Sequence, residues 1–161
     1  MRVDWKPCHL RNITTMAITS IKHFRTLPLL AALSLSPLTA HPADLEVSVT
    51  GVRSTDGQVK LMLFDHAEGF RKEDKARQVL ALPAVAGEVH GMFHGLPAGQ
   101  YAILVYHDEN GDGKLNLRFG MFPKEGYGLS NNPKVSGPPA FKDSAFDVAE
   151  GGKRIDIKLI Y

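Results

Sequence analysis

Cysteine is almost absent from the 161-residue sequence, in which Cys8 is the only one. One cysteine cannot form a disulfide within the chain, so the fold has to rest on a hydrophobic core instead of covalent cross-links. Cys8 also lies in an N-terminal segment that we expect to be removed. We therefore expect a mature protein with neither a thiol nucleophile nor a cysteine-linked lipid anchor.

A hydrophobic run long enough to cross a membrane is also lacking. The longest apolar stretch, residues 27–38, is too short to span a bilayer, and it follows a positively charged stretch at residues 22–25. Small residues come next at Ala40 and Ala43. This is the pattern of a secretory signal peptide, whose natural start is Met16. It predicts a periplasmic or secreted protein, cleaved after Ala40 or after Ala43, with Ala43 preferred.

These features divide the chain into an N-terminal extension with its signal peptide, residues 1–43, and a folded domain, residues 44–161. The alternative, a buried helix over residues 27–38, conflicts with Pro28 and Pro37 inside the run. The folded domain alone has 14 basic and 16 acidic side chains, so its net charge is −2 although that of the whole chain is +2. We expect no nucleic acid partner and no transmembrane segment in the mature chain.

Short stretches with apolar residues in alternation or in runs predict β-strands separated by turns. They lie at residues 45–52, 59–64, 79–82, 88–93, 101–106, 145–148 and 154–161. We expect the first two to form a hairpin around Asp56 and Gly57, and the polar residues 65–78 to form a helical turn or a long loop. Short strands at about ten-residue spacing predict an all-β domain, a single antiparallel β-sandwich of about seven strands, immunoglobulin-like or transthyretin-like.

The segment GLPAGQY at residues 95–101 links two predicted strands. Its tyrosine, Tyr101, opens the most apolar run of the chain, YAILVY. In sandwich domains a tyrosine at such a position donates its hydroxyl to loop backbone, an arrangement called a tyrosine corner. We predict this bond for Tyr101, a feature of the fold that carries no information about function.

The sharpest local motif is HDENGDGKLN at residues 107–116. Its oxygen donors follow the spacing of a calcium-binding loop, with Gly113 at the sharp turn. The candidate metal ligands are Asp108, Asn110, Asp112, Lys114 (through its carbonyl) and Asn116. The position that holds a glutamate in such loops is Phe119, so a Ca²⁺ site here needs another carboxylate, for which Glu125 is the candidate. The alternative is a structural turn whose side chains bond their own backbone.

Residues 118–140 form the longest stretch without a strand pattern, and loops of this length in a compact domain are usually functional. Their aromatic, glycine and amide content is typical of adaptable recognition surfaces. The candidate ligand-binding residues are Phe119, Phe122, Lys124, Glu125, Tyr127, Ser130, Asn131 and Asn132. The alternative is that the aromatic side chains only hold the loop over one end of the sandwich.

Four motifs in this order, GLPAGQYA, HDENGDGKLN, GMFPKEGYGLSNN and GPPAFKDSAF, resemble the exported bacterial family DUF2141. The resemblance covers nearly all of residues 45–161. It implies a single immunoglobulin-like or transthyretin-like sandwich after a signal peptide. The family brings no established activity, so the resemblance implies fold and location only.

Other arrangements of polar residues give weaker hypotheses. His90 and His94 lie about 13 Å apart on a strand, too far to share a metal. A hydrolase triad of His107, Asp108 and Ser130 lacks the GxSxG motif. Our leading hypothesis is an exported, non-enzymatic module that binds a protein, peptide or glycan through the loops around residues 107–141. A Ca²⁺-binding structural or carrier domain is the alternative, and a hydrolase is third.

Overall fold

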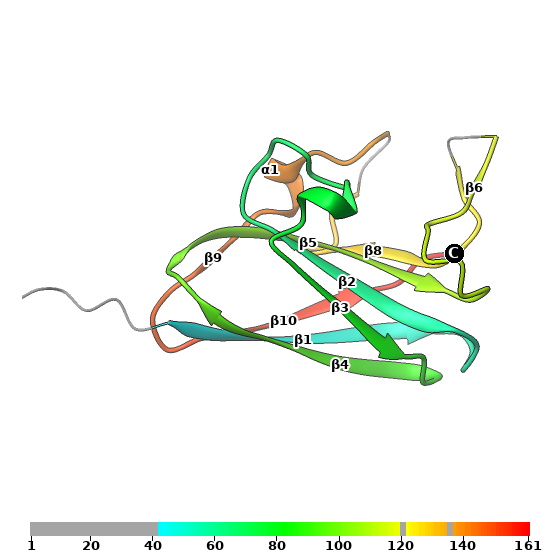
Figure 1. Ribbon diagram of the computed structural model, residues 1–161, viewed down its shortest axis with the longest axis horizontal. Helices are drawn as coiled ribbons and strands as arrows, with labels where there is room; N and C mark the ends of the chain where they lie inside the picture. Colours follow the sequence, from blue (N-terminus) through cyan, green and yellow to red (C-terminus); the bar gives the residue numbers. More distant parts are fainter. Residues whose placement is uncertain (1–41, 120–121, 135–136) are drawn as a thin grey trace, which may run out of the picture. The chain divides into compact units, whose positions relative to one another are not determined.

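The computed structural model describes residues 42–119, 122–134 and 137–161 (Figure 1). The predicted N-terminal extension and signal peptide lie outside the described residues, except for Pro42 and Ala43. The described residues form an all-β domain with two main sheets packed face to face. No helix in this part of the chain has the length and apolar character needed to cross a membrane.

The first sheet has the strand order β10-β1-β4. Its strands are β1 (Ala43–Val52), β4 (Gly87–Leu96) and β10 (Lys153–Lys158). β1 pairs with β4 in antiparallel and with β10 in parallel orientation, so the sandwich contains one parallel pair.

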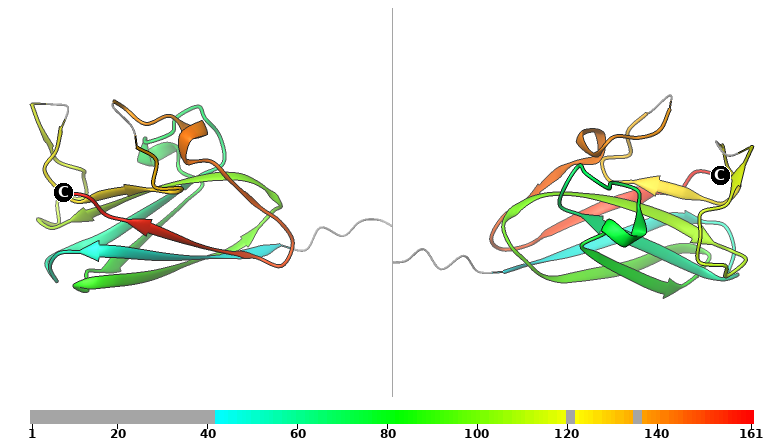
Figure 2. Two further views of the ribbon diagram at one scale, coloured as in Figure 1. Left: turned by 180° about the vertical axis from the view of Figure 1, so that it is seen from behind. Right: turned by 45° about the horizontal axis from the view of Figure 1, so that its top comes forward.

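The second sheet has the order β3-β2-β5-β8, and β9 also pairs with β5. Its strands are β2 (Gln58–Phe64), β3 (Gln78–Pro83), β5 (Gly99–Asp108), β8 (Tyr127–Leu129) and β9 (Phe146–Val148). A separate two-stranded hairpin consists of β6 (Leu117–Arg118) and β7 (Phe122–Pro123). This hairpin, the turn after β1 and the C-terminal residue lie at the same end of the sandwich (Figure 2).

All seven predicted strands are present, but the predicted pairing of the first two is wrong. β1 and β2 belong to different sheets, so the turn at Asp56 and Gly57 crosses from one sheet to the other. The physical reason is that the apolar faces of the two strands pack against each other across the core, where Val47 and Leu61 are fully buried. The stretch 118–140, which showed no strand pattern, contains β7 and β8.

The main core fills the space between the sheets, and a second apolar cluster covers the outer face of the second sheet. Phe70, from the excursion between β2 and β3, packs edge-on against Phe64 and Phe141, with ring centroids 5.2 and 5.8 Å away. Phe141 opens the short helix α1 (Phe141–Ser144), and the excursion contains the predicted helical turn, η1 (Glu73–Lys75). β5 is therefore covered on both faces, as its apolar run predicted.

The predicted tyrosine corner is confirmed. The hydroxyl of Tyr101 donates to the carbonyl of Pro97 at 2.8 Å, and the residue is only 3% exposed. Burial raises the pKa of this hydroxyl. The bond fixes the entry of the chain into β5, the strand whose other end carries the candidate site.

Candidate ligand-binding site

Strand topology brings distant segments together at the end of the sandwich that carries the β6–β7 hairpin. β1 and β10 are parallel neighbours, so the residues that follow them emerge at the same edge. Arg53 follows β1, and Tyr161 lies three residues beyond the end of β10. The end of β5 lies there too, because its last residue, Asp108, pairs with Gln58 at the start of β2.

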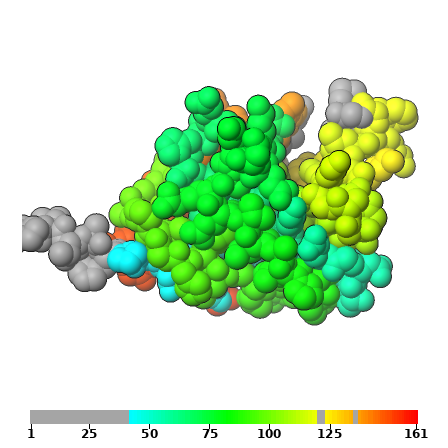
Figure 3. Space-filling view, in the orientation of Figure 1, coloured from blue at the N-terminus to red at the C-terminus, as the bar shows by residue number. Residues whose placement is uncertain are grey.

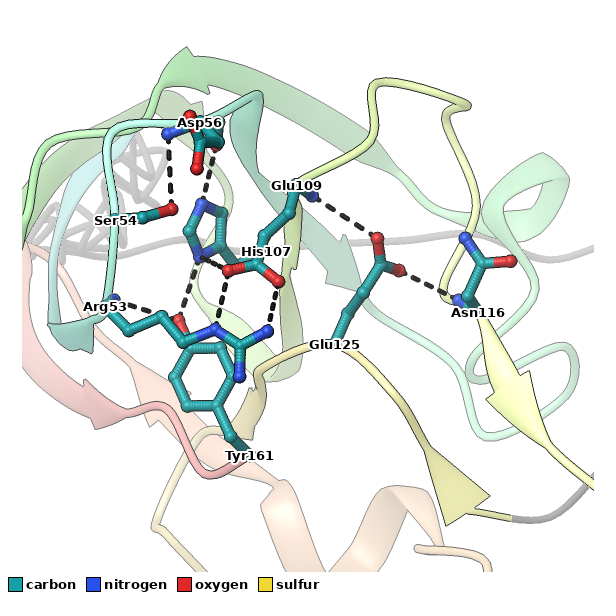
Figure 4. Close-up of polar contacts among 8 residues, drawn as sticks. All are labelled: Arg53, Ser54, Asp56, His107, Glu109, Asn116, Glu125 and Tyr161. Atoms are coloured by element: carbon teal, nitrogen blue, oxygen red, sulfur yellow. Dashed lines mark hydrogen bonds and ion pairs between the residues drawn. The ribbon is translucent and has the colours of Figure 1, made fainter.

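His107, near the end of β5, is completely buried and both of its ring nitrogens are bonded. Nε2 lies 2.8 Å from the carbonyl oxygen of Asp56, and Nδ1 lies 2.8 Å from the hydroxyl of Tyr161 (Figure 4). Because a carbonyl only accepts, Nε2 carries a proton, and in the neutral ring Nδ1 accepts from Tyr161. His107 thus links the β1–β2 turn to the segment after β10.

Arg53 and Glu109 form an ion pair next to this histidine. The guanidinium donates to both carboxylate oxygens, with Nε and Oε1 2.6 Å apart, and it stacks 4.3 Å from the ring centroid of Tyr161. The Arg53 guanidinium lowers the pKa of Glu109, while burial raises the pKa of Tyr161. The pair fixes the Glu109 side chain beside the opening of a cavity.

Glu125 holds the two ends of the turn between β5 and β6. It is 5% exposed, and its carboxylate oxygens accept the backbone N–H groups of Glu109 and Asn116 at 3.3 and 2.9 Å. Figure 4 shows its side chain between these residues. The carboxylate therefore satisfies main-chain donors at both ends of the turn and sets the shape of the surface there.

A cavity of about 350 Å³ opens at this place. Its lining consists of Glu109, Asn110, Asn116, Lys124 and Glu125. Lys124 is held against the turn because its N–H donates to the carbonyl of Asn116 at 2.8 Å. Carboxylates, amides and an ammonium group thus line a polar cavity that is open to solvent.

A family model described as "Uncharacterized protein conserved in bacteria (DUF2141)" matches residues 47–156. The chain belongs to the DUF2141 family. The matched residues run from β1 to β10 and include every residue that lines the cavity. No curated protein and no solved structure matches the chain.

The predicted metal ligands of this DUF2141 domain are neighbours in space, but their oxygens accept N–H groups of the same turn. Asp108, fully buried, accepts the backbone N–H groups of Asp112 and Gly113 at 3.1 and 2.9 Å. Asp112 accepts the side-chain amides of Asn110 and Asn116, and the Asn116 bond lowers its pKa. Lys114, exposed, donates its N–H to Asp112. The geometry is that of an Asx-rich turn, the structural alternative for this motif.

The structure places the predicted ligand-binding residues in different parts of the domain. Lys124 and Glu125 line the cavity, and Phe119 lies exposed on the adjoining hairpin. The side chain of Phe122, in β7, lies outside the described residues. The remaining four do not line the cavity: Tyr127, Ser130, Asn131 and Asn132.

These four residues hold the sandwich together. Tyr127, half-buried in β8, exchanges two backbone bonds with Ile160. Buried Ser130 bonds the main chain of β5 and α1, and Asn131 donates to the carbonyl of Ala145. Asn132 accepts the N–H of Lys158 and donates to the carbonyl of Asp156 at the edge of β10. Their polar groups therefore serve the fold.

Sequence reasoning missed Arg53, Glu109 and Tyr161 as members of the site. Arg53 and Tyr161 are 108 positions apart, and only the parallel pairing of β1 with β10 brings them together. The hydrolase set is not assembled, because Ser130 bonds main-chain groups of Ile103 and Ser144 while His107 bonds Asp56 and Tyr161.

Proposed function

We propose that this DUF2141 protein is an exported, non-enzymatic binding module that holds its ligand in the polar cavity beside the β6–β7 hairpin. The observation that carries the proposal is the cavity itself, lined by side chains from the turn after β5 and from the segment after β7. Its walls are fixed by Glu125 and by the Arg53–Glu109 pair. A polar recognition surface on a rigid sandwich is preorganised, which reduces the entropy cost of binding.

The protonation chemistry of the lining favours binding over catalysis. Arg53 occupies both oxygens of Glu109 and lowers the pKa of this carboxylate, so it is a poor proton acceptor near neutral pH. The oxygens of Glu125 accept main-chain N–H groups. Both carboxylates are therefore used to position the cavity wall. The exposed ammonium group of Lys124 remains for a ligand, and so does the hydrogen-bonding capacity of Asn110 beyond its two bonds to Asp112.

Amide chemical shifts of the full chain test this proposal in a screen of short peptides, oligosaccharides and cell-wall fragments. We expect a bound compound to shift the amides of Asn110, Asn116 and Lys124. Lys124→Ala should weaken binding, whereas Lys142→Ala, which removes an exposed lysine on α1, should leave it unchanged. The proposal is overturned if no compound binds, or if compounds bind while these amides and the Lys124→Ala affinity are unaffected.

The alternative, Ca²⁺ binding by the turn, is favoured by one specific observation. Glu125, the carboxylate expected to complete the ligand set, lies directly against the turn and bonds the N–H of Asn116. A loop without the usual glutamate should bind weakly, with a Kd of about 10⁻³ M. About 10 mM Ca²⁺ would then stabilise the fold by about 1.4 kcal/mol.

Thermal unfolding of the full chain with and without Ca²⁺ tests this second candidate. Asp112→Asn should abolish the stabilisation, because it removes a charge but keeps an acceptor for the bonds of the turn. Mg²⁺ should stabilise less, since it requires stricter geometry. A parent protein whose unfolding does not respond to Ca²⁺ would exclude the site.

A further inference from the structure

Phe119, in the hairpin of β6 and β7, is highly exposed for an aromatic residue. At 85% exposure it is the most exposed large apolar side chain in the described part of the chain. It also has a φ of 54°, in the left-handed region that non-glycine residues rarely adopt. Among the described residues, neither packing of the ring nor backbone preference accounts for this conformation. An exposed aromatic residue on strained backbone points to a role in contact with another molecule.

The hairpin that carries Phe119 begins at the cavity. Asn116 and Lys124, which line the cavity, are bonded to each other immediately before β6 and after β7. Phe119 is three residues beyond Asn116, at most about 10 Å along the chain. In the space-filling view the segment that contains β6 projects at the edge of the sandwich (Figure 3). One ligand longer than a single sugar ring can therefore contact both the phenyl ring and the cavity.

The two parts of this surface offer complementary chemistry. The face of a phenyl ring carries partial negative charge and attracts the C–H groups of an apolar ligand face. The cavity offers hydroxyl partners of both kinds, because its amide side chains can donate and accept and the Lys124 ammonium group donates. A sugar ring combines a C–H face with a rim of hydroxyl groups. A peptide anchor, in contrast, needs an apolar pocket, and the described lining contains no apolar side chain.

We infer that the ligand of the proposed binding module is an oligosaccharide of two or more sugar units, with one ring stacked on Phe119 and the next in the cavity. This inference rests on the proposed function and names its ligand class. In this arrangement Lys124 donates to ring hydroxyls, and Asn110 bonds them through the hydrogen-bonding capacity that its contacts with Asp112 leave free. The Phe119 ring lies flat against a sugar face.

Calorimetric titration of the full chain with cellotetraose, chitotetraose and maltotetraose tests the inference. We expect at least one of them to bind, and Phe119→Ala to weaken its affinity about tenfold, as expected for the loss of one stacking contact. Phe119→Trp should retain the affinity because it keeps an aromatic face. Val85→Ala is the matched control, since Val85 is another exposed apolar residue, 55% exposed and located between β3 and β4.

The outcomes separate this inference from the proposed function. If all three tetrasaccharides fail to bind but a peptide binds in a Lys124-dependent way, the oligosaccharide inference is overturned and the cavity remains the binding site. If a tetrasaccharide binds the parent and the Phe119→Ala variant equally well, the stacking role is overturned. If neither class of compound binds, both proposals are wrong.

Discussion

The Nδ1 atom of His107 and the hydroxyl oxygen of Tyr161 are 2.8 Å apart, although 54 positions separate the two residues in the sequence. The hydroxyl also accepts the N–H of Arg53 at 3.1 Å. One phenol group thus connects the end of β5 with the segments that follow β1 and β10, and so joins the two sheets at the end that carries the cavity.

Tyr161→Phe should destabilise the fold by about 1–3 kcal/mol, because it leaves Nδ1 of a fully buried imidazole without a partner. Urea unfolding of parent and variant measures this difference. Tyr127→Phe is a suitable control, since the Tyr127 hydroxyl has no hydrogen-bond partner among the described residues. Equal stability of Tyr161→Phe and the parent would mean that the Tyr161 hydroxyl does not support the buried histidine.

The ion pair between Arg53 and Glu109 should make stability depend on pH. The pKa of Glu109 is lower in the folded than in the unfolded protein, where it is about 4.3. Glu109 therefore stabilises the fold at pH values above about 4.3, and this contribution is lost as the pH falls through the lowered pKa. The Glu109 and Arg53 side chains are 20% and 50% exposed. Glu109→Gln should therefore cost at most about 1 kcal/mol near neutral pH.

This difference between parent and Glu109→Gln should shrink steadily on acidification below about pH 4.3. Unfolding free energies at several pH values measure it. Glu150→Gln, which removes an exposed carboxylate that forms no ion pair within the described residues, serves as the control for the loss of one carboxylate. A Glu109→Gln penalty that is constant over this range would contradict the assigned pKa direction.

Much of the fold followed from local sequence patterns. The run YAILVY predicted a central strand because a strand buried on both faces has no polar alternation, and Tyr101 marked its start. The predicted turn after Asp108 also has the expected local bonds, since Asx side chains and glycines act within a few residues. Such features depend on neighbouring residues alone and are visible in the sequence.

Strand partners and the candidate site depended on topology, which local patterns do not encode. β1 and β2 are separated by a short turn, yet they pack across the core. β1 pairs with β4 and β10, whereas β2 pairs with β3 and β5, and all four partners come later in the chain. Arg53 and Tyr161 meet only as a result of that pairing. Conversely, Ser130 and Asn132 are residue types that often contact ligands, but they bond main-chain groups of β5 and β10. Their role depends on burial and orientation, which residue type does not reveal.

The tyrosine corner gives a prediction about fold stability. Tyr101→Phe removes the bond to Pro97 and should cost about 0.5–1.5 kcal/mol, the usual net contribution of one hydrogen bond. Tyr101→Ala also removes a buried ring and should cost about 3–5 kcal/mol. Chemical denaturation measures both values. A small penalty for the alanine variant would show that the ring contributes little to the core.

The start of β1 at Ala43 leads to a prediction about where the proposed signal peptide is cleaved. Ala43 is 3% exposed and pairs with Leu96 in β4, so cleavage after Ala43 would remove a buried strand residue. Cleavage after Ala40 would leave β1 intact. The structure thus favours Ala40 over Ala43, the site that the sequence alone favoured, and we expect mass spectrometry of the native protein to place its N-terminus at His41. An N-terminus at Asp44, or a cytoplasmic protein that retains residues 22–40, would contradict this expectation.

Phe119 offers a test of whether its backbone strain serves binding. Glycine adopts a positive φ without the Cβ clash, so Phe119→Gly should be more stable than Phe119→Ala, which keeps the clash, by about 1 kcal/mol. Both variants lack the aromatic ring and should lose tetrasaccharide affinity equally. Thermal unfolding and calorimetric titration of the two variants measure these effects. A glycine variant that is more stable but binds more weakly would show that Phe119 lowers the stability of the fold while it supports binding, as functional residues often do. Equal stability of the two variants would show that the left-handed conformation is not strained.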